Sequence, residues 1–409
     1  MSATIGLDDF RRAARAFLDE HCERKVEETF VWGKGSDRVG MFEERTPDEE
    51  RRKVEAAKTW RQQLFDAGFG WITGPVEYGG RGLGVQHQRA WLEEAAGYRT
   101  GDETPFTIGL GMVAPTILAH AIEEVRHRYL RALWRGETIS CQLFSEPVAG
   151  SDLAGIQTRA ERDGDEWTLT GQKVWTSGAQ FSDIGEIITR TSPDKPKHKG
   201  LTMFLIDMHA PGVEIRPLRQ MTGGASFNEV FLEEVRVPDS HRLGDVDEGW
   251  SVALTTLMNE RMSIGTGMGS GGGTAMGSFT RLVAMAKRFG TDADPVVRQK
   301  LADLYVHTSA SRWNNLRGLA KIKAGQTPGP EMSIAKLAGT MNGLRTSALL
   351  SDLLGAKLVA DSGEWGTYAW SELVLGMPGA RIAGGTDEVM RNILGERVLG
   401  LPKDPSHPR

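Results

Sequence analysis

QLFSEPVAGSDLAG at Gln142–Gly155 and KVWTS at Lys173–Ser177 are the most informative stretches of this sequence. The first is typical of a strand that runs into a turn, because proline, serine and glycine follow its apolar start. Small residues in such a turn leave backbone N–H groups and hydroxyls uncovered, which suits an anionic or polar ligand. The second follows a hairpin signal at Asp163-Gly164-Asp165. The pair predicts either a plain β-turn beside a tryptophan-bearing strand or part of a binding site.

Length, charge and cysteine content limit the number of domains and argue against several kinds of protein, such as nucleic-acid-binding and membrane-spanning ones. The chain has 409 residues, enough for two or three domains. A net charge of −5 without long basic runs argues against a nucleic-acid-binding surface. No apolar run approaches the about 20 residues that cross a bilayer, and no signal-peptide pattern opens the chain. With Cys22 and Cys141 as its two cysteines, we expect a cytoplasmic protein in a reducing compartment, without a disulfide framework or a metal site.

Hydrophobic periodicity predicts a helical first part and a helical last part around a short β domain. Apolar residues recur at helical spacing in the first 140 residues, and we expect one helix over Val113–Arg135. From about Ser140 to Val237, short segments rich in β-branched residues alternate with turns, which is typical of an antiparallel sheet. From Trp250 onward, the pattern is again helical. The further expected helices span Val296–Lys323, Met332–Ala360, Thr367–Val374 and Glu388–Leu399.

Several motifs in this order resemble the acyl-CoA dehydrogenase family over nearly the whole chain. EYGGRG at Glu77–Gly82 resembles a loop of its N-terminal domain. FSEPVAGSD at Phe144–Asp152, followed by GQKVWTS at Gly171–Ser177, resembles its flavin-binding β domain. FNEVFLEEVRVP at Phe227–Pro238 and RNILGERVLGLP at Arg391–Pro402 resemble its last β strand and last helix. The resemblance implies an α+β fold: an all-α domain at 1–139, an antiparallel β-barrel at 140–245 and a four-helix bundle at 246–409.

The resemblance also implies a function and its cofactor. Members hold FAD without a covalent bond, dehydrogenate an acyl-CoA thioester to the trans-2-enoyl-CoA, and pass electrons to an electron-transfer flavoprotein. A homotetramer or an α2β2 heterotetramer is expected. Trp175 would cover one face of the flavin ring, Ser177 would hydrogen-bond near its reactive nitrogen, and Ser151 would also touch the CoA arm. The remaining expected contacts of the β domain with FAD are Gln142, Phe144, Ser145, Gly150 and Thr176.

The catalytic base is expected at an unusual position. Many members carry a glutamate before the last helix, where this chain has Gly384, and glycine cannot act as a base. The Gly384 backbone N–H would still hydrogen-bond the thioester carbonyl. Branches that act on branched and long acyl chains carry the glutamate before an arginine on the first bundle helix, where this chain has Glu260 and Arg261. We therefore expect Glu260 to be the base, although a solvated helix carboxylate is the plain alternative.

Residues around these two positions complete the expected site. Asn259, Arg261 and Gly385 would contact the substrate, and Thr386 would contact the flavin. Glu388 is a rival carboxylate that would face the outer contacts of the cofactor, whereas Asp387 is expected to be a helix-start carboxylate favoured by the helix dipole.

Three further segments depart from the family pattern. Seven glycines lie between Gly265 and Gly277, and they indicate either close helix packing or space for a bulky acyl group. The second flavin motif is altered to AKRFG, so Lys287 or Arg288 would meet the pyrophosphate from a neighbouring subunit. The glycine loop that reaches the adenine is reduced to SDLLG at Ser351–Gly355. Two alternatives therefore stay open: a flavin oxidase on this fold, and a subunit with a partial site or none.

Overall fold

The computed structural model describes residues 5–26, 30–39, 46–265, 279–324, 326 and 329–403. The chain divides into two compact units. The first contains Met1–Glu28, Arg45–Leu218 and Ser226–Glu260. The second contains Thr29–Glu44, Arg219–Ala225 and Arg261–Arg409. The side chains of 261–265, which include Arg261, and the part of the glycine run at 266–278 lie outside the described residues.

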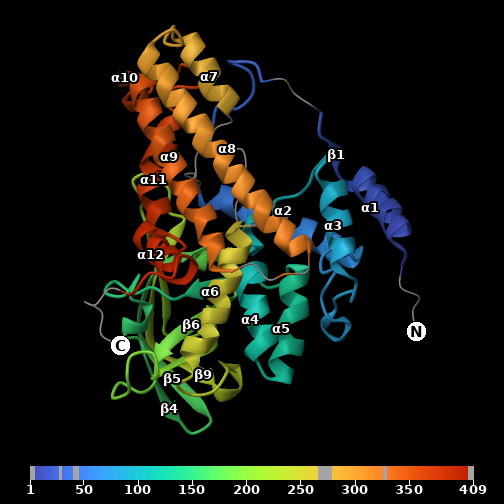
Figure 1. The fold of residues 1–409 in the computed structure, drawn as a ribbon. Coiled ribbons are helices and arrows are strands. Elements are labelled where there is room, and N and C mark those ends of the chain that lie inside the picture. Colours follow the sequence, from blue (N-terminus) through green and yellow to red (C-terminus); the bar gives the residue numbers. More distant parts are fainter. Residues whose placement is uncertain are drawn as a thin grey trace. The chain divides into compact units, whose positions relative to one another are not determined.

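Five helices precede the sheet of the first unit (Figure 1). A capping box starts α2, because the Thr46 hydroxyl accepts from the Glu49 N–H and the Glu49 carboxylate accepts from the Thr46 N–H. The single helix expected over Val113–Arg135 is wrong: the chain is extended at Ala121, which separates α4 from α5. These helices are α1 (Leu7–His21), α2 (Pro47–Asp66), α3 (Val85–Ala95), α4 (Ala114–His120) and α5 (Glu123–Arg135).

The sheet that follows has eight strands and is mostly antiparallel. Its hydrogen-bonded order is β10-β7-β6-β4-β5-β9-β8, and β3 adds to β6 in parallel. The strands are β3 (Ser140–Leu143), β4 (Arg159–Asp163), β5 (Glu166–Ser177), β6 (Ile184–Arg190), β7 (Leu201–Asp207), β8 (Val213–Leu218), β9 (Phe227–Pro238) and β10 (Arg242–Leu243). A separate two-stranded ribbon joins β1 (Glu23–Arg24) to β2 (Tyr98–Arg99).

The two faces of the sheet pack into different apolar clusters. Alternate residues such as Cys141, Leu143 and Ile187 face a cluster formed within the sheet, with Phe204 at its centre. The other face, which includes Ile184 and Ile188, packs on helices α4, α5 and α6 (Gly249–Gly265). Figure 1 shows α6 lying along α4 and α5 over the strands. Helix α6 is therefore held against the sheet by one continuous core.

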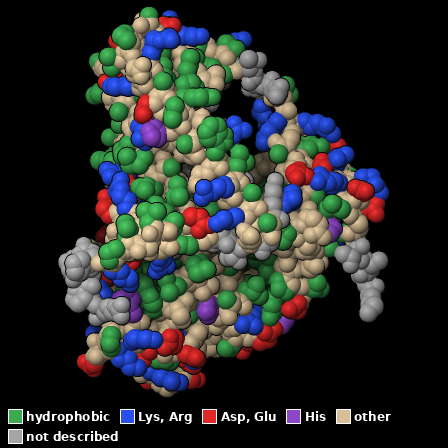
Figure 2. Space-filling view, in the orientation of Figure 1, with side chains coloured by type: hydrophobic (Ala, Val, Ile, Leu, Met, Phe, Trp, Pro, Cys, Tyr) green, Lys and Arg blue, Asp and Glu red, His purple; other side chains and the backbone are tan. Residues whose placement is uncertain are grey.

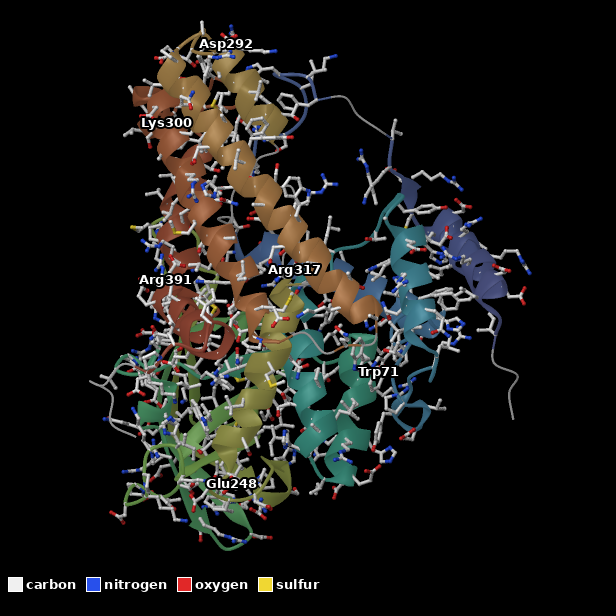
Figure 3. The ribbon with its side chains drawn as sticks, viewed as in Figure 1. Trp71, Glu248, Asp292, Lys300, Arg317 and Arg391 are labelled. Carbon is white, nitrogen blue, oxygen red and sulfur yellow. The ribbon has the colours of Figure 1, made fainter. Side chains whose placement is uncertain are left out.

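The second unit is a helical bundle around its own core. Two helix predictions had wrong bounds: the helix expected over Met332–Ala360 was too long, and the one expected over Thr367–Val374 was too short. Gly355 separates α9 from α10 with φ +48°, and α11 runs well past Val374 although it contains Pro378. Lys300 of α8 forms an ion pair with Asp352 of α9 (Figure 3). The helices are α7 (Phe279–Arg288), α8 (Pro295–Lys323), α9 (Ser333–Leu354), α10 (Ala356–Val359), α11 (Trp370–Ile382) and α12 (Asp387–Ile393), which a π-helix extends over Leu394–Val398.

Among the described helices, none combines the length and apolar character that crossing a membrane requires.

Candidate functional site

The turn after β3 and the end of β5 are joined by backbone hydrogen bonds. The Val174 N–H donates to the Ser145 carbonyl at 2.9 Å. Within the turn, Glu146 and Ala149 exchange two backbone hydrogen bonds, each 3.0 Å, which closes it around Pro147 and Val148. The two stretches that the sequence singles out therefore form one surface, with Ser145 half-buried at its edge.

A buried ion pair locks this junction. Lys173 Nζ lies 2.9 Å from Glu146 Oε1 and donates to the Phe144 carbonyl at 3.1 Å. The Glu146 carboxylate also accepts from the backbone N–H groups of Gln157 and Thr158, at 2.6 and 2.9 Å. Burial alone would raise the pKa of Glu146, but the Lys173 charge and these hydrogen bonds outweigh it and hold the pKa below its usual value. Three segments meet at this carboxylate, namely the turn itself, residues 157–158 and β5, and together they fix the turn rigidly.

Trp175 is exposed on the surface that this pair supports. Its backbone has φ +62°, a left-handed conformation that is unusual for a bulky residue, and the β5–β9 register shifts between Lys173 and Thr176. The bulge leaves the indole 60 % exposed, with Phe227 as an edge-on neighbour at 6.0 Å. Strain of this kind persists where the surrounding structure enforces it, commonly at ligand sites. An exposed aromatic plane so held suits stacking on a planar ring.

The other predicted β-domain contacts differ in what they can offer a ligand. Gln142 and Ser177 are half-buried, and Gly150 and Ser151 are exposed. Phe144 packs its side chain into the core.

Thr176 is 1 % exposed, and its hydroxyl finds no hydrogen-bond partner among the described residues. The Asn228 amide donates to the Thr176 carbonyl at 3.1 Å. The Thr176 side chain thus points away from the face that shows Trp175. The residues of this surface fit a flavin ring because they combine an exposed, fixed indole with the half-buried hydroxyls of Ser145 and Ser177.

The predicted base and its neighbour lie on α6, in the first unit. Glu260 and Asn259 are both half-buried there. The Asn259 amide donates to the Thr255 carbonyl at 2.9 Å, one turn earlier, so this side chain is tied to its own helix. His120 of α4 bonds Thr255 Oγ1 at 2.8 Å, and burial lowers the pKa of that imidazole. The segment before Glu260 is therefore anchored from α4.

In the second unit, the segment before α12 is a glycine turn. Gly384 and Gly385 have φ +66° and +92°, the left-handed region that side chains other than glycine rarely adopt. A Cβ on Gly385 would also come within 2.5 Å of Met390. The Thr386 hydroxyl caps α12 by accepting from the Val389 N–H. At position 384, the positive φ is a conformation that glycine adopts more readily than a residue with a side chain.

The remaining predicted contacts of the second unit lie on helix surfaces. Lys287 and Arg288 are exposed at the end of α7, where Arg288 lies 4.0 Å from Glu364. Glu388 is exposed and pairs with Arg391, one turn along α12. Cations at an exposed helix end can meet a phosphate, whereas an exposed Glu388 makes a poor candidate for a base.

Sequence reasoning missed the buried ionisable residues Glu146, Lys173 and Glu186, and it predicted only part of the role of Asp387. Asp387 does begin α12, but it is fully buried and accepts from Arg381 Nε and Thr340 Oγ1, each at 2.8 Å. The signal available in the sequence was a charge inside an apolar strand, as in the run IGEIITR around Glu186.

Comparison with known proteins shows similarity along nearly the whole chain. Models of the acyl-CoA dehydrogenase N-terminal, middle and C-terminal domains match residues 7–137, 141–235 and 247–399. Acyl-CoA dehydrogenase IpdE1 of Mycobacterium tuberculosis is 34 % identical over 88 % of this chain and 91 % of its own length. Acyl-CoA dehydrogenase FadE34 of the same organism is 39 % identical over 87 % of this chain, which spans only 47 % of that relative.

Solved structures give the same result. The Tcur3481-Tcur3483 steroid ACAD is 27 % identical with a TM-score of 0.72, covering 99 % of this chain and 100 % of that one. The ChsE4-ChsE5 complex from Mycobacterium tuberculosis is 25 % identical with a TM-score of 0.66, and the match covers 99 % of this chain and 100 % of that one.

Proposed function

Because this chain belongs to the acyl-CoA dehydrogenase family of FAD-dependent oxidoreductases, we propose that it converts an acyl-CoA thioester to the trans-2-enoyl-CoA. We propose an electron-transfer flavoprotein as the electron acceptor. The observation that carries this proposal is Trp175, an exposed indole that a left-handed backbone and the buried Glu146–Lys173 pair hold in place. Such a rigid aromatic surface is what a flavin ring needs from the protein.

The residues that would hold FAD are those of this surface. Trp175 would stack on the ring, and Ser145 and Ser177 would offer hydroxyl hydrogen bonds to it. Gln142, Phe144, Gly150 and Thr176 contribute backbone or amide groups, and Ser151 contacts both cofactor and CoA. Lys287 or Arg288 would meet the pyrophosphate from the neighbouring subunit, Thr386 would contact the flavin, and Glu388 would face the outer contacts of the cofactor. When bound, the flavin supplies the acceptor for a hydride from the acyl β-carbon.

The protein's own chemical task is to remove the α-proton. The proton beside a thioester is very weakly acidic, so the carboxylate must be positioned and negative charge on the carbonyl must be stabilised. We assign the first role to Glu260 and the second to the backbone N–H of Gly384. Asn259, Arg261 and Gly385 orient the substrate. Because Glu260 is half-buried, it can be reached by substrate while much of the surrounding water is kept out.

The exchange of Glu260 for glutamine tests the assignment. Glu260→Gln should still bind FAD, but the rate of flavin reduction by substrate under anaerobic conditions should fall about 10²- to 10⁴-fold. Glu388→Gln is the matched control, because it removes the rival carboxylate and should retain most of the rate. Undiminished reduction by Glu260→Gln would contradict the assignment. A wild-type chain that binds no FAD would contradict the proposed function itself.

We propose a bulky, steroid-derived acyl group as the substrate. One similar structure is titled a steroid ACAD, and a base on α6 is the arrangement that the family resemblance associates with branched and long acyl chains. An anaerobic titration with straight-chain, branched and sterol side-chain acyl-CoAs should bleach the flavin fastest with the sterol thioester. A preference for short straight chains would contradict this substrate class.

A second candidate is a subunit that is active only with a sister chain. The relative FadE34 is about twice as long as the matched region, and the ChsE4-ChsE5 structure is titled a complex. The exposed face of α8 supports assembly, because Tyr305, Val306, Trp313 and Leu316 are each more than half exposed. These four residues fall on one side of the helix. Separate purification distinguishes the cases: a chain without FAD that gains it on mixing with a sister chain favours the second.

A further inference from the structure

Glu186 is a buried carboxyl that the proposed reaction does not use. It lies in the middle of β6 and is 0 % exposed, on the sheet face that packs against α4, α5 and α6. The apolar residues of that interface offer it no compensation, and none of the described cations pairs with it. A charge in such a place is costly. Burial accordingly raises the pKa of Glu186 to about 8, so the group is neutral at pH 7.

The carboxyl instead ends a chain of hydrogen bonds that joins three elements. Thr256 Oγ1 of α6 lies 2.6 Å from Glu186 Oε1. Thr116 Oγ1 of α4 lies 2.9 Å from Thr256 Oγ1 and 2.8 Å from the Met112 carbonyl. All three side chains, Glu186, Thr256 and Thr116, are fully buried. The strand and both helices therefore meet at one polar contact inside an apolar core.

The number of protons available to this series of hydrogen bonds explains why Glu186 is better accommodated there in its neutral form. Three contacts join Glu186, Thr256, Thr116 and the Met112 carbonyl, and each hydroxyl has one proton. A neutral Glu186 supplies the third proton, so the hydroxyls donate in one direction and end on the carbonyl. An ionised Glu186 would reverse the direction and leave the Met112 carbonyl without the Thr116 proton. The neutral form thus satisfies these three contacts, while Thr256 Oγ1 also lies 3.4 Å from the Val252 carbonyl and Glu186 Oε2 has no hydrogen-bond partner among the described residues.

This contact is placed where it can orient the predicted base. Glu260 follows Thr256 by four residues on α6, which is about 6 Å along the axis and about 40° around it. On the other side, Glu186 pairs in register with Gln142 of β3, the strand that leads into the flavin surface. Apolar packing by Val252 and Ala253 is not directional, so a small shift of α6 along the sheet costs little free energy. A hydrogen bond, by contrast, fixes the register of α6 against the sheet.

We propose that Glu186 is a positioning residue: through Thr256 it sets the register of α6 against the sheet and so aligns Glu260 with the flavin surface. This inference rests on the proposed function, because it takes Glu260 as the base. Glu186 touches neither substrate nor cofactor in this scheme. Its removal should therefore affect the reaction step and leave the binding of FAD and of substrate in place.

A pair of variants tests the role. Glu186→Leu removes the polar contact and leaves an apolar side chain of similar size, and we expect flavin reduction by substrate to slow about 10- to 100-fold. Glu186→Gln keeps a donor for Thr256 and should recover most of the rate. Reduction by dithionite, which needs no base, should be equal in both. In the FAD-free proteins, amide hydrogen exchange along α6 should be faster in Glu186→Leu than in Glu186→Gln.

The outcomes separate this proposal from the assignment of the base. Reduction of Glu186→Leu by substrate at the wild-type rate would overturn the positioning role, whatever Glu260→Gln does. Equal losses in Glu186→Leu and Glu186→Gln would also overturn it, because the hydrogen bond would not be the cause. If Glu186→Leu does not fold, Thr256→Val removes the same contact by losing one hydroxyl, and a wild-type rate there would count against the proposal. Failure of the base assignment would show in Glu260→Gln alone.

Discussion

At the scale of single residues, the first unit shows two solutions for a buried glutamate. Glu146 stays ionised because Lys173 and two backbone N–H groups surround it, whereas Glu186 stays neutral because burial raises its pKa and the Thr256 hydroxyl compensates only part of that effect. A glutamate side chain thus forms a buried ion pair as an anion at position 146, and a buried hydrogen bond as a neutral acid at position 186. The surroundings decide the state, through the balance of burial against compensating charge.

Breaking the Glu146–Lys173 pair should destabilise the protein strongly. Lys173→Met leaves the Glu146 carboxylate buried without its cation, and we expect a loss of about 3–5 kcal/mol in the free energy of unfolding. FAD affinity should fall with it, because the turn before Trp175 loses its support. The control is the double variant Glu146→Gln/Lys173→Met, which leaves no buried charge and should regain part of the stability. Urea denaturation measures both, and equal losses in the two variants would contradict this account.

Glu186 should make stability depend on pH in a defined direction. Its folded pKa of about 8 lies above its usual value of 4.5, so between these values the folded protein holds a proton that the unfolded chain has lost. This group therefore lowers stability by about 1.4 kcal/mol for each unit of rising pH in that window, and its effect levels off above it. Glu186→Gln should gain stability relative to wild type between pH 5 and 8. Parallel denaturation profiles would contradict the prediction.

At this scale, the sequence pointed to the exposed residues around Trp175, but it did not indicate the buried ionisable residues. Trp175 and its small-residue neighbours stand out because their residue types are unusual for a turn and a strand end. Glu146, Lys173 and Glu186 did not stand out, because a charged residue in a turn or a strand usually faces solvent. Their partners come from segments whose register is set by the folded sheet, including a bulge at Trp175 that no local pattern indicates.

At the scale of elements, α12 is held by an anion at its first residue. The Asp387 carboxylate binds Arg381 of α11 and Thr340 of α9, and Lys336 Nζ lies 3.4 Å away. Burial alone would raise the pKa of Asp387, but these partners outweigh it and lower the pKa. One carboxylate thus joins three helices of the second unit. The sequence predicted its place at a helix start, but the helix dipole is only part of its role.

Asp387→Asn should loosen α12. The amide can still accept from Thr340, but Arg381 and Lys336 lose their anion, and we expect a loss of about 3 kcal/mol in the free energy of unfolding. Because the folded pKa is lowered, the stabilisation by this carboxylate is present at neutral pH and lost as the pH falls through that pKa. Wild type and variant should therefore converge in acid. Glu388→Gln on the exposed side of the same helix is the control, and an equal loss there would refute the assignment.

Helix ends were the least predictable feature of the elements. The break at Ala121 and the left-handed Gly355 divide apolar patterns that are continuous in the sequence. Conversely, Pro378 did not end α11 where a proline commonly would. In each case, packing against neighbouring helices decides, and that packing is not visible in the local sequence.

At the scale of the whole molecule, the unexplained surface is the apolar side of α8. Figure 2 shows hydrophobic side chains among the charged ones on the long helices of the second unit. Trp313 and Val306 are 68 % and 62 % exposed on the same side of this helix. Such a stripe is typical of a surface that another subunit covers.

Trp313→Lys should weaken assembly. A charge in the middle of the stripe would be buried without a partner in any oligomer that uses it. Light scattering after size-exclusion chromatography should then show smaller particles than for wild type. Val359→Lys is the matched control, since Val359 is 80 % exposed but lies on α10. If both variants or neither changed the mass, the α8 stripe would not be the contact.

The buried Glu146–Lys173 pair has a consequence for the order of folding. Its two members lie 27 residues apart, and Lys173 lies on the second strand of the β4–β5 hairpin. The turn cannot be locked until β5 has brought Lys173 next to Glu146, just before the shift in the β5–β9 register. We therefore expect the place for the flavin ring to form only after β5 is in position, so that FAD binds a part of the protein that is already folded. A shortage of FAD should then lower the lifetime of the protein more than its rate of folding.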